Sequence, residues 1–321
     1  MHPMARRWPG IGPWDEVWFL EVSVGAGHSV WLRYVLGDGP HRRGLATWAV
    51  ATLPTGLLAD QGHFDLAGLR PDRPIALGDE LWLDAPDPAG VPHGGEAEGA
   101  ARGIAGAASW DLRLHVGPRG HRMVPAVVER LGVGRTYVPA LMDLHVSGDV
   151  HIGDQHVQLD RAPAVLGHIW GASNRTTEWA WCHAHLPDEG VLFEGLSVRL
   201  GRLPLLTTIG LWIGDEHVQL SRARHLVRTR SRLGPDRWSF EARGRGLTLR
   251  GEATLPTSDR VAQVRYLDPG DGRVRGCRNS AGSSLDLTLL QPTGTRRFRF
   301  EDAAFEVARL GEPGGPVLLS D

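Results

Sequence analysis

The sequence predicts an all-β protein that is built from two related β-units. At 321 residues the chain is long for one hydrophobic core and comfortable for two. Polar and apolar residues alternate in many short segments separated by Gly, Pro or Asp, as is typical of half-buried β-strands. An eleven-residue segment also occurs twice, as IGDQHVQLDRA from Ile152 and as IGDEHVQLSRA from Ile213. Such an internal repeat indicates a duplicated supersecondary unit.

The alternating segments run along most of the chain. They are residues 16–24, 28–36, 45–53, 109–116, 178–186, 191–200, 205–213, 247–255, 260–267, 284–290 and 296–301. In both repeats Gly-Asp is a typical turn pair, and His-Val-Gln-Leu alternates between polar and apolar residues. We therefore interpret each copy as a β-hairpin, with a repeated catalytic loop as the alternative. We expect one β-domain over residues 1–175 and a second over residues 176–321.

Two segments depart from the strand pattern. Residues 124–132 (VPAVVERLG) have a short helical pattern, and residues 84–106 are small, polar and rich in Gly and Pro. The second segment predicts a flexible loop or lid. No Gly-rich fingerprint lies between a strand and a helix, which argues against a dinucleotide-binding fold.

The composition excludes several classes of function. The chain has no lysine, which removes Schiff-base chemistry and the phosphate-loop lysine. Two cysteines cannot form a disulfide framework or a four-cysteine zinc site. Residues 199–299 are rich in arginine and the rest is acidic, so the two halves could dock by charge, or their charges could lie on solvated faces. Without a compact basic run or interleaved aromatic residues, we expect no nucleic-acid partner.

The same sequence favours a cytoplasmic protein. The N-terminal residues are not followed by the apolar core of a signal peptide. No stretch approaches the roughly 20 apolar residues of a membrane span, so we expect no stable membrane insertion. The oligomeric state is not indicated.

Aromatic and imidazole groups concentrate in residues 167–194. If residues 177–185 form a strand, small residues (Ala180, Cys182, Ala184) share one face with Glu178, and larger side chains share the other. The second face is formed by Thr177, Trp179, Trp181, His183 and His185. His168 and Trp170 project together just upstream.

Three interpretations fit this cluster. His183 and His185 could reach one metal ion, with His168 as a third ligand. The cluster could also be a structural core. We favour a third interpretation, an apolar ligand pocket with a few convergent polar groups. Because indole faces stabilise cations and a His or carboxyl group can deliver a proton, such a pocket suits protonation of an alkene.

These residues also carry a resemblance to a known family. GHIWG (167–171) followed by EWAWCHAHLPDEG (178–190) resembles the His-x-Trp and Trp-x-Trp signature of the carotenoid 1,2-hydratase (hydroxyneurosporene synthase, CrtC) and AttH-like proteins. Tocopherol cyclases and lipocalin-type Diels–Alderases are more distant relatives. Residues 16–36, 109–116 and 193–201 are similar to other stretches of the family, and the resemblance covers about residues 14–215 in patches.

The resemblance implies two consecutive lipocalin-like antiparallel β-domains, barrels or sandwiches, that hold a hydrophobic ligand. His168 and Trp170 fall on the His-x-Trp pair that is implicated in hydration by the carotenoid enzymes. Those enzymes also use a downstream Tyr and Asp, whereas this chain has no Tyr between Tyr137 and Tyr266. That part of the family's machinery is therefore absent or replaced.

We predict a protein that binds a large apolar small molecule, such as a polyprenoid, fatty acyl or polyketide. It is expected to perform acid–base chemistry without cofactor or metal, as a hydratase, cyclase or isomerase. His168 is the first candidate for the acid and Glu194 the second, because an apolar pocket raises the pKa of a carboxyl group. The predicted ligand-binding residues are Trp110, Trp170, Trp179, Trp181, His183 and His185. The alternative is a non-catalytic carrier of a hydrophobic ligand.

Overall fold

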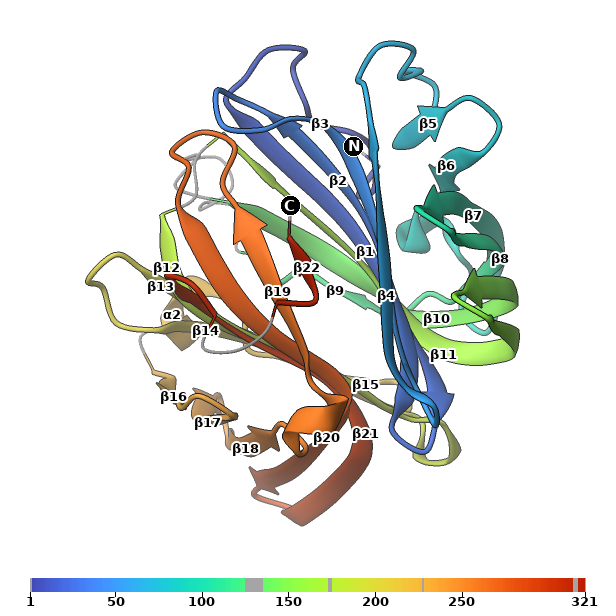
Figure 1. The fold of residues 1–321 in the computed structure, drawn as a ribbon. Helices are drawn as coiled ribbons and strands as arrows, with labels where there is room; N and C mark the ends of the chain where they lie inside the picture. Colours follow the sequence, from blue (N-terminus) through green and yellow to red (C-terminus); the bar gives the residue numbers. More distant parts are fainter. Residues whose placement is uncertain (1, 125–134, 173–174, 227, 314–316, 321) are drawn as a thin grey trace.

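The chain forms two curled antiparallel β-sheets that lie side by side as half-barrels (Figure 1). This computed structural model describes residues 2–124, 135–172, 175–226, 228–313 and 317–320. The all-β prediction is confirmed. The short helical pattern of residues 124–132 lies almost wholly outside the described residues. Within the described ranges, no helix is long and apolar enough to cross a membrane.

The first sheet contains the strands up to Gly171, in the order β4-β3-β2-β1-β11-β10-β8-β7-β6-β5, with β9 paired to β10. Its strands are β1 (Trp14–Gly25), β2 (His28–Asp38), β3 (Arg43–Leu53), β4 (Gly56–Phe64), β5 (Ile75–Leu77), β6 (Leu81–Asp84), β7 (Ala97–Ala105), β8 (Ala108–Val116), β9 (Gly120–His121), β10 (Thr136–Ile152) and β11 (Gln155–Gly171). A 3-10 turn, η1 (Pro88–Gly90), lies between β6 and β7.

The second sheet contains the strands from Thr176 onward, in the order β15-β14-β13-β12-β21-β20-β18-β17-β16. Strand β19 pairs with β20 and with β22. The strands are β12 (Thr176–Leu186), β13 (Val191–Leu200), β14 (Leu206–Ile213), β15 (Glu216–Gln219), β16 (Arg230–Leu233), β17 (Arg237–Gly244), β18 (Leu247–Thr254), β19 (Ala262–Leu267), β20 (Val274–Gln291), β21 (Gly294–Leu310) and β22 (Leu319–Ser320). Short helical turns are η2 (Pro187–Glu189), α2 (Ala223–Leu226) and η3 (Ser258–Arg260). The two strand orders correspond, with β12 in the place of β1 and the β20–β21 hairpin in the place of β10–β11.

Both copies of the repeated segment form tight hairpins, as predicted. Ile152 pairs with Gln155 and Ile213 pairs with Glu216, so each turn has two residues. Gly153 and Gly214 have φ of 58° and 56°, which suits the first central position of a type II′ turn. The first hairpin joins β10 to β11 and the second joins β14 to β15. These places are not equivalent in the two sheets, so the repeat reflects a shared turn and not the correspondence of the half-barrels.

The prediction of one flexible loop over residues 84–106 is wrong for its second half. Strand β7 occupies residues 97–105 and pairs with both β6 and β8. Its small residues serve packing, because a Cβ atom at Gly103 would lie 2.2 Å from the ring of Trp110. At Gly103, therefore, the indole ring of Trp110 leaves room only for glycine.

Each half-barrel has its own apolar core, and a third apolar layer lies between them. Trp18 belongs to the first core and Trp238 to the second. Phe19 and Trp181 belong to the layer between, where the two sheets meet. Strand β1 is therefore buried on both faces, with Trp18 pointing into its own half-barrel and Phe19 toward the other.

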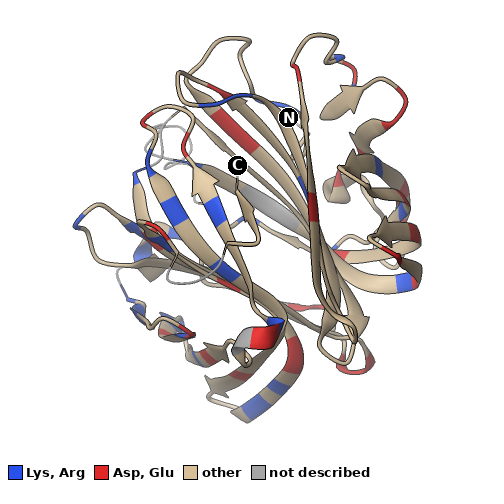
Figure 2. Cartoon of the chain, in the orientation of Figure 1, with Lys and Arg blue, Asp and Glu red and all other residues tan. Residues whose placement is uncertain are grey.

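The arginines of the second half-barrel lie mainly on its solvated outer strands (Figure 2). Arg237 pairs with Glu252, and both Arg243 and Arg250 pair with Glu241. These exposed pairs are local to the second sheet. The charge asymmetry of the sequence is thus found largely on a solvated face.

Candidate functional site

Alternation along β12 decides which side chains reach the space between the half-barrels. Trp179 and Trp181 contact the interdomain layer, while Ala180 and Cys182 belong to the core of the second half-barrel. The predicted division of this strand into a ring face and a small-residue face is confirmed. The ring face meets the outer side of β1 and β11.

An apolar cavity of about 170 Å³ lies in this interdomain layer. Both half-barrels supply its walls, and aromatic rings dominate them. The aromatic lining residues are Phe19, Trp31, Tyr137, Trp179, Trp181 and Tyr266. Among the polar side chains on the wall are Arg33 and Glu306. A mostly apolar cavity with a few polar groups is typical of a small-molecule site.

Glu194 on β13 is the buried carboxyl group beside this cavity. It is fully buried, and its Oε1 atom accepts a hydrogen bond from Trp181 Nε1 at 2.9 Å. The Tyr137 hydroxyl donates a second, close hydrogen bond to the same oxygen. Burial raises the pKa of Glu194 to about 7, although these two hydrogen bonds lower it in part. The carboxyl group can therefore hold or release a proton near neutral pH.

Tyr137 connects Glu194 to the cavity. Tyr137 and Trp181 line the cavity, whereas Glu194 is not part of the wall. Burial and the neighbouring Glu194 raise the pKa of Tyr137 well above its ordinary value, so the phenol keeps its proton. A proton can pass between Glu194 and the cavity only through a group such as this hydroxyl.

A second carboxyl group, that of Glu306, faces the cavity from β21. It accepts hydrogen bonds from Trp179 Nε1 and, at 3.3 Å, from the Tyr266 hydroxyl. The Arg33 guanidinium lies 4.4 Å from the centre of the Tyr266 ring and also stacks over Trp31. Cation–π contacts of this kind hold a charged group against an aromatic wall.

His168 is not near this cavity, contrary to our prediction. It is fully buried inside the first half-barrel, where its ring stacks on Trp18 with centroids 4.6 Å apart. Its Nδ1 lies 2.8 Å from the carbonyl oxygen of Pro3, and its Nε2 lies 2.8 Å from Glu16 Oε1. Glu16 also accepts hydrogen bonds from two backbone N–H groups and an indole. Both ring nitrogens thus face oxygen atoms, so hydrogen-bond partners hold the His168 ring on both sides inside the first half-barrel.

Trp170 and Trp110 also lie in the first half-barrel and not at the interdomain cavity. Trp170 stands beside His168 and under the guanidinium of Arg7, 5.1 Å from its ring centre. Trp110 is buried in the core and donates a hydrogen bond to the Tyr34 hydroxyl at 2.7 Å. The predicted ligand-binding set is therefore divided between two sides of the first sheet.

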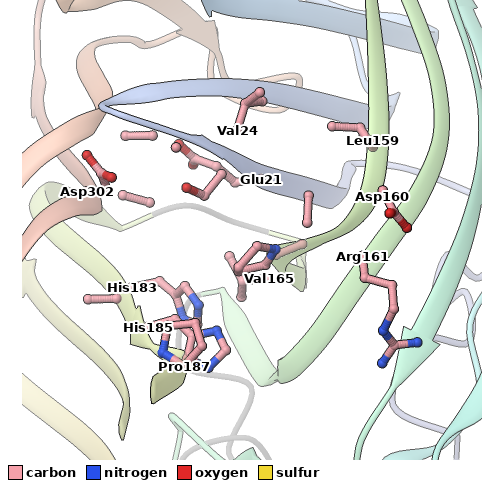
Figure 3. Close-up of a pocket in the computed structure, with 18 of the residues that line it drawn as sticks. Glu21, Val24, Leu159, Asp160, Arg161, Val165, His183, His185, Pro187 and Asp302 are labelled. Carbon is pink, nitrogen blue, oxygen red and sulfur yellow. The ribbon is translucent and has the colours of Figure 1, made fainter. Parts of the chain in front are cut away.

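His183 and His185 line a second cavity between the half-barrels (Figure 3). Burial lowers the pKa of His183 to about 3 and that of His185 to about 4, so both rings are neutral. Among the described residues, no three His, Cys, Asp or Glu side chains gather as metal ligands. His168 lies across the first sheet from this pair, which separates the three histidines of the zinc interpretation.

Tyr137, Tyr266 and Glu306 are among the cavity residues that sequence reasoning missed. Two of the three tyrosines of the chain line the cavity, but one comes from the first half-barrel and the other from β19. Tyr137 meets Glu194 across 57 residues of sequence. In the sequence, Tyr137 and Glu194 stand out only as polar groups within apolar strands. That pattern does not indicate that the two side chains meet.

Solved structures of two proteins match nearly the whole chain. A protein from Nitrosomonas europaea, provisionally assigned to AttH, is 14% identical with a TM-score of 0.55, over 94% of this chain and 98% of its own. Kievitone hydratase from Nectria haematococca is 9% identical with a TM-score of 0.53, over 94% of this chain and 89% of its own. Neither the family models nor the curated proteins give a match to the sequence. The structural likeness confirms the predicted fold class of two consecutive lipocalin-like β-domains.

Proposed function

We propose that the protein is a cofactor-free enzyme of the hydratase type that acts on an apolar small molecule in the interdomain cavity. One observation carries this proposal. A buried carboxyl group, Glu194, with a pKa raised to about 7, is hydrogen-bonded to Tyr137 and Trp181, which both line the cavity. The fold likeness to kievitone hydratase, a hydratase by name, supports the reaction class.

The Tyr137–Glu194 pair would deliver the proton. When Glu194 is protonated, its carboxyl group can donate to the phenol oxygen, and the Tyr137 O–H then turns toward the cavity. The hydroxyl gives its proton to one alkene carbon while the carboxyl proton moves to the phenol oxygen, which leaves Glu194 ionised. Water then adds to the resulting carbocation, and the proton that this water loses restores Glu194. The faces of Trp179 and Trp181 stabilise the positive charge, each by about 1–2 kcal/mol when desolvated.

The size of the cavity limits which part of the substrate it surrounds. A cavity of about 170 Å³ holds little more than one ring, since a cavity of roughly 150 Å³ accommodates benzene. A polyprenoid, fatty acyl or polyketide substrate would therefore place only its reacting segment here. The rest of the molecule would extend along the interface between the half-barrels.

Mass spectrometry of ligands extracted from the purified protein is the first test. We expect an apolar compound with an alkene, or its hydrated product, in about equal amount to the protein. Compounds of the same class can then be screened for turnover. A tightly bound ligand that is never converted would establish a carrier and refute the enzyme proposal.

Variants of the donor pair test the mechanism. We expect Glu194→Gln and Tyr137→Phe to lower turnover by about 10²–10⁴-fold while they still bind ligand, because a general acid contributes that much. Glu241→Gln, which changes a partly exposed glutamate of β17 away from the cavity, is the matched control and should keep full activity. Full activity in both donor variants would contradict the assignment.

A further inference from the structure

The second interdomain cavity has a volume of about 460 Å³ and shares no lining residue with the first. Strands β1 and β11 form one side, and β12, β20 and β21 contribute to the other (Figure 3). Part of its wall is apolar, with Val165, Ala281 and Ala304 among the lining residues. The carboxyl group of Glu21 stands on this wall, across from His183.

Glu21 is a buried carboxyl group without a partner. Its side chain is 3% exposed, and neither carboxyl oxygen has a hydrogen-bond partner among the described residues. Asn279 on β20 lies close, but its Nδ2 atom also lacks a partner in the described part of the chain. A buried polar group is normally hydrogen-bonded, so an unpartnered carboxyl on a cavity wall indicates a group that a ligand satisfies.

The charged groups near Glu21 and on the cavity wall are mostly acidic. Glu306 on β21 acts directly on Glu21, while the exposed carboxyl groups of Asp302 on β21 and Asp160 on β11 line the same cavity. From β12, Cys182 lies behind Glu21 with a thiol whose pKa burial raises well above its ordinary value, and His183 is neutral. These groups supply no positive charge.

One arginine lines the cavity, and it is already paired. Arg161 forms an ion pair with Glu96, which lies outside the cavity wall. Burial and the repulsion of Glu306 raise the pKa of Glu21 to about 8, so the carboxyl group is mostly protonated at neutral pH. Ionising it at pH 7 costs only about 1.4 kcal/mol for each pKa unit.

We propose that this cavity binds a small organic cation, an ammonium group carried on an apolar body, with the Glu21 carboxylate as its counter-ion. Glu21 gives up its proton to solvent when the ammonium binds, and a neutral imidazole such as that of His183 can accept an ammonium N–H. The apolar body of the ligand packs against Val165 and Ala304.

This ligand fits better than an anion or a neutral molecule. An anion would meet Asp160 and Asp302, while the one arginine among the described lining residues is already paired. A neutral molecule could accept a hydrogen bond from protonated Glu21, but it would bring no positive charge to a wall whose other described carboxyl groups are acidic. Only a cation supplies the charge that the described wall lacks.

Calorimetry with cyclohexylammonium and cyclohexanol, which have the same shape, tests the proposal on the wild-type protein. We expect the ammonium to bind at least about tenfold more tightly than the alcohol, with close to one proton released per ligand at pH 7 in buffers of different ionisation heat. Its affinity should rise by up to about fifty-fold between pH 6 and pH 8 and level off above pH 8, as Glu21 becomes ionised. Equal affinity for the alcohol, or no proton release, would overturn the proposal.

Two glutamine variants locate the site. Glu21→Gln should lose at least about tenfold in ammonium affinity and should abolish proton release, because it removes the counter-ion and keeps the shape. Glu194→Gln, which changes the carboxyl group beside the apolar cavity, should leave the ammonium affinity and the proton release unchanged. The ammonium site can therefore be refuted without refuting the proposed hydratase function, and the reverse also holds. If Glu21→Gln does not fold, the wild-type comparison of cyclohexylammonium with cyclohexanol still tests whether the protein prefers a cation. Retention of ammonium binding in a folded Glu21→Gln protein would refute the proposal.

Discussion

Glu16, Glu21 and Glu194 are all buried, and the donors around each carboxyl group decide its state. Glu16 has four hydrogen-bond partners, one of them the His168 ring, and is part of the packed core of the first half-barrel. Glu194 accepts two, from Tyr137 and Trp181, and has a pKa near neutrality. Glu21 has no donor within hydrogen-bond geometry among the described residues, and burial raises its pKa to about 8 although the nearby Asn279 side chain lowers it in part. The number of donors thus sets which of these acids is structural and which can exchange a proton.

The raised pKa of Glu21 makes stability depend on pH. Between its ordinary value of 4.5 and its folded value of about 8, the folded state binds more protons than the unfolded state. The free energy of unfolding therefore falls as pH rises through this window, and the loss is complete above it. Glu21→Gln removes this contribution, so relative to wild type it should gain stability from pH 5 to pH 8, by at most about 1.4 kcal/mol per pH unit.

Urea unfolding of both proteins at pH 5, 6.5 and 8 measures this gain. Histidines with lowered pKa, such as His183, weaken the fold on the acid side, but they are present in both proteins and cancel in the difference. A difference that stays constant with pH would show that Glu21 is ionised in the folded protein.

A structural role for His168 is separable from a catalytic one. His168→Phe should keep the stacking on Trp18 but leave the buried Glu16 carboxyl group with one hydrogen-bond partner fewer, which typically costs about 1–3 kcal/mol. The double variant His168→Phe/Glu16→Gln should recover part of that loss in urea unfolding. Turnover per folded molecule should be unchanged, and a large loss of turnover at full stability would restore His168 as the catalytic acid.

At the scale of the element, the two repeated hairpins allow a matched comparison. Gly153 and Gly214 have φ of 58° and 56°, and an added Cβ atom would meet nothing closer than 3.9 Å at either position. Gly→Ala at each should therefore cost only the backbone strain of a left-handed residue, about 1–2 kcal/mol. Gly90→Ala is the control, because its surroundings are also open and its φ is outside the left-handed region.

Chemical denaturation of the three variants measures these costs. Similar losses at Gly153 and Gly214 and almost none at Gly90 would show that the turn alone requires glycine. Unequal losses at the two hairpins would mean that tertiary contacts, and not the shared turn, set the requirement.

At the scale of the whole molecule, ionic contacts connect the two half-barrels at one end of the interface. Asp268 of the second half-barrel lies 3.7 Å from Arg135 of the first and 3.7 Å from Arg275 of its own. Arg275 is 2% exposed and donates a hydrogen bond to the Thr176 carbonyl. Arg135 also pairs with Asp15, which lines the apolar cavity.

Asp268→Asn should destabilise the protein by about 3 kcal/mol, because Arg275 stays buried with a weaker partner. We expect the loss in urea unfolding together with faster proteolysis between the half-barrels. Arg273→Gln, which removes an exposed arginine that pairs locally with Asp271, is the control. An unchanged stability in Asp268→Asn would show that the apolar layer alone holds the half-barrels together.

The sequence by itself determined the strands, their alternation and the turns between them. Because side chains alternate between the two faces of a β-strand, the sequence placed Trp179 and Trp181 on one face. The Gly-Asp pairs likewise specified both hairpins, since a tight turn depends on local backbone geometry alone. It also indicated Glu194, a carboxyl group in an apolar strand.

Only the tertiary structure decided which face of each strand meets the other half-barrel. Strands β1 and β11 are apolar on both faces, so alternation could not tell that His168 points inward while Ile169 points to the cavity. The meeting of Tyr137 with Glu194 likewise needed the two sheets to dock, because hydrogen bonds between distant strands follow from packing and not from local pattern. The state of Glu21 was hidden for the same reason: Glu306 and Asn279, which act on it, come from the second half-barrel, more than two hundred residues along the chain.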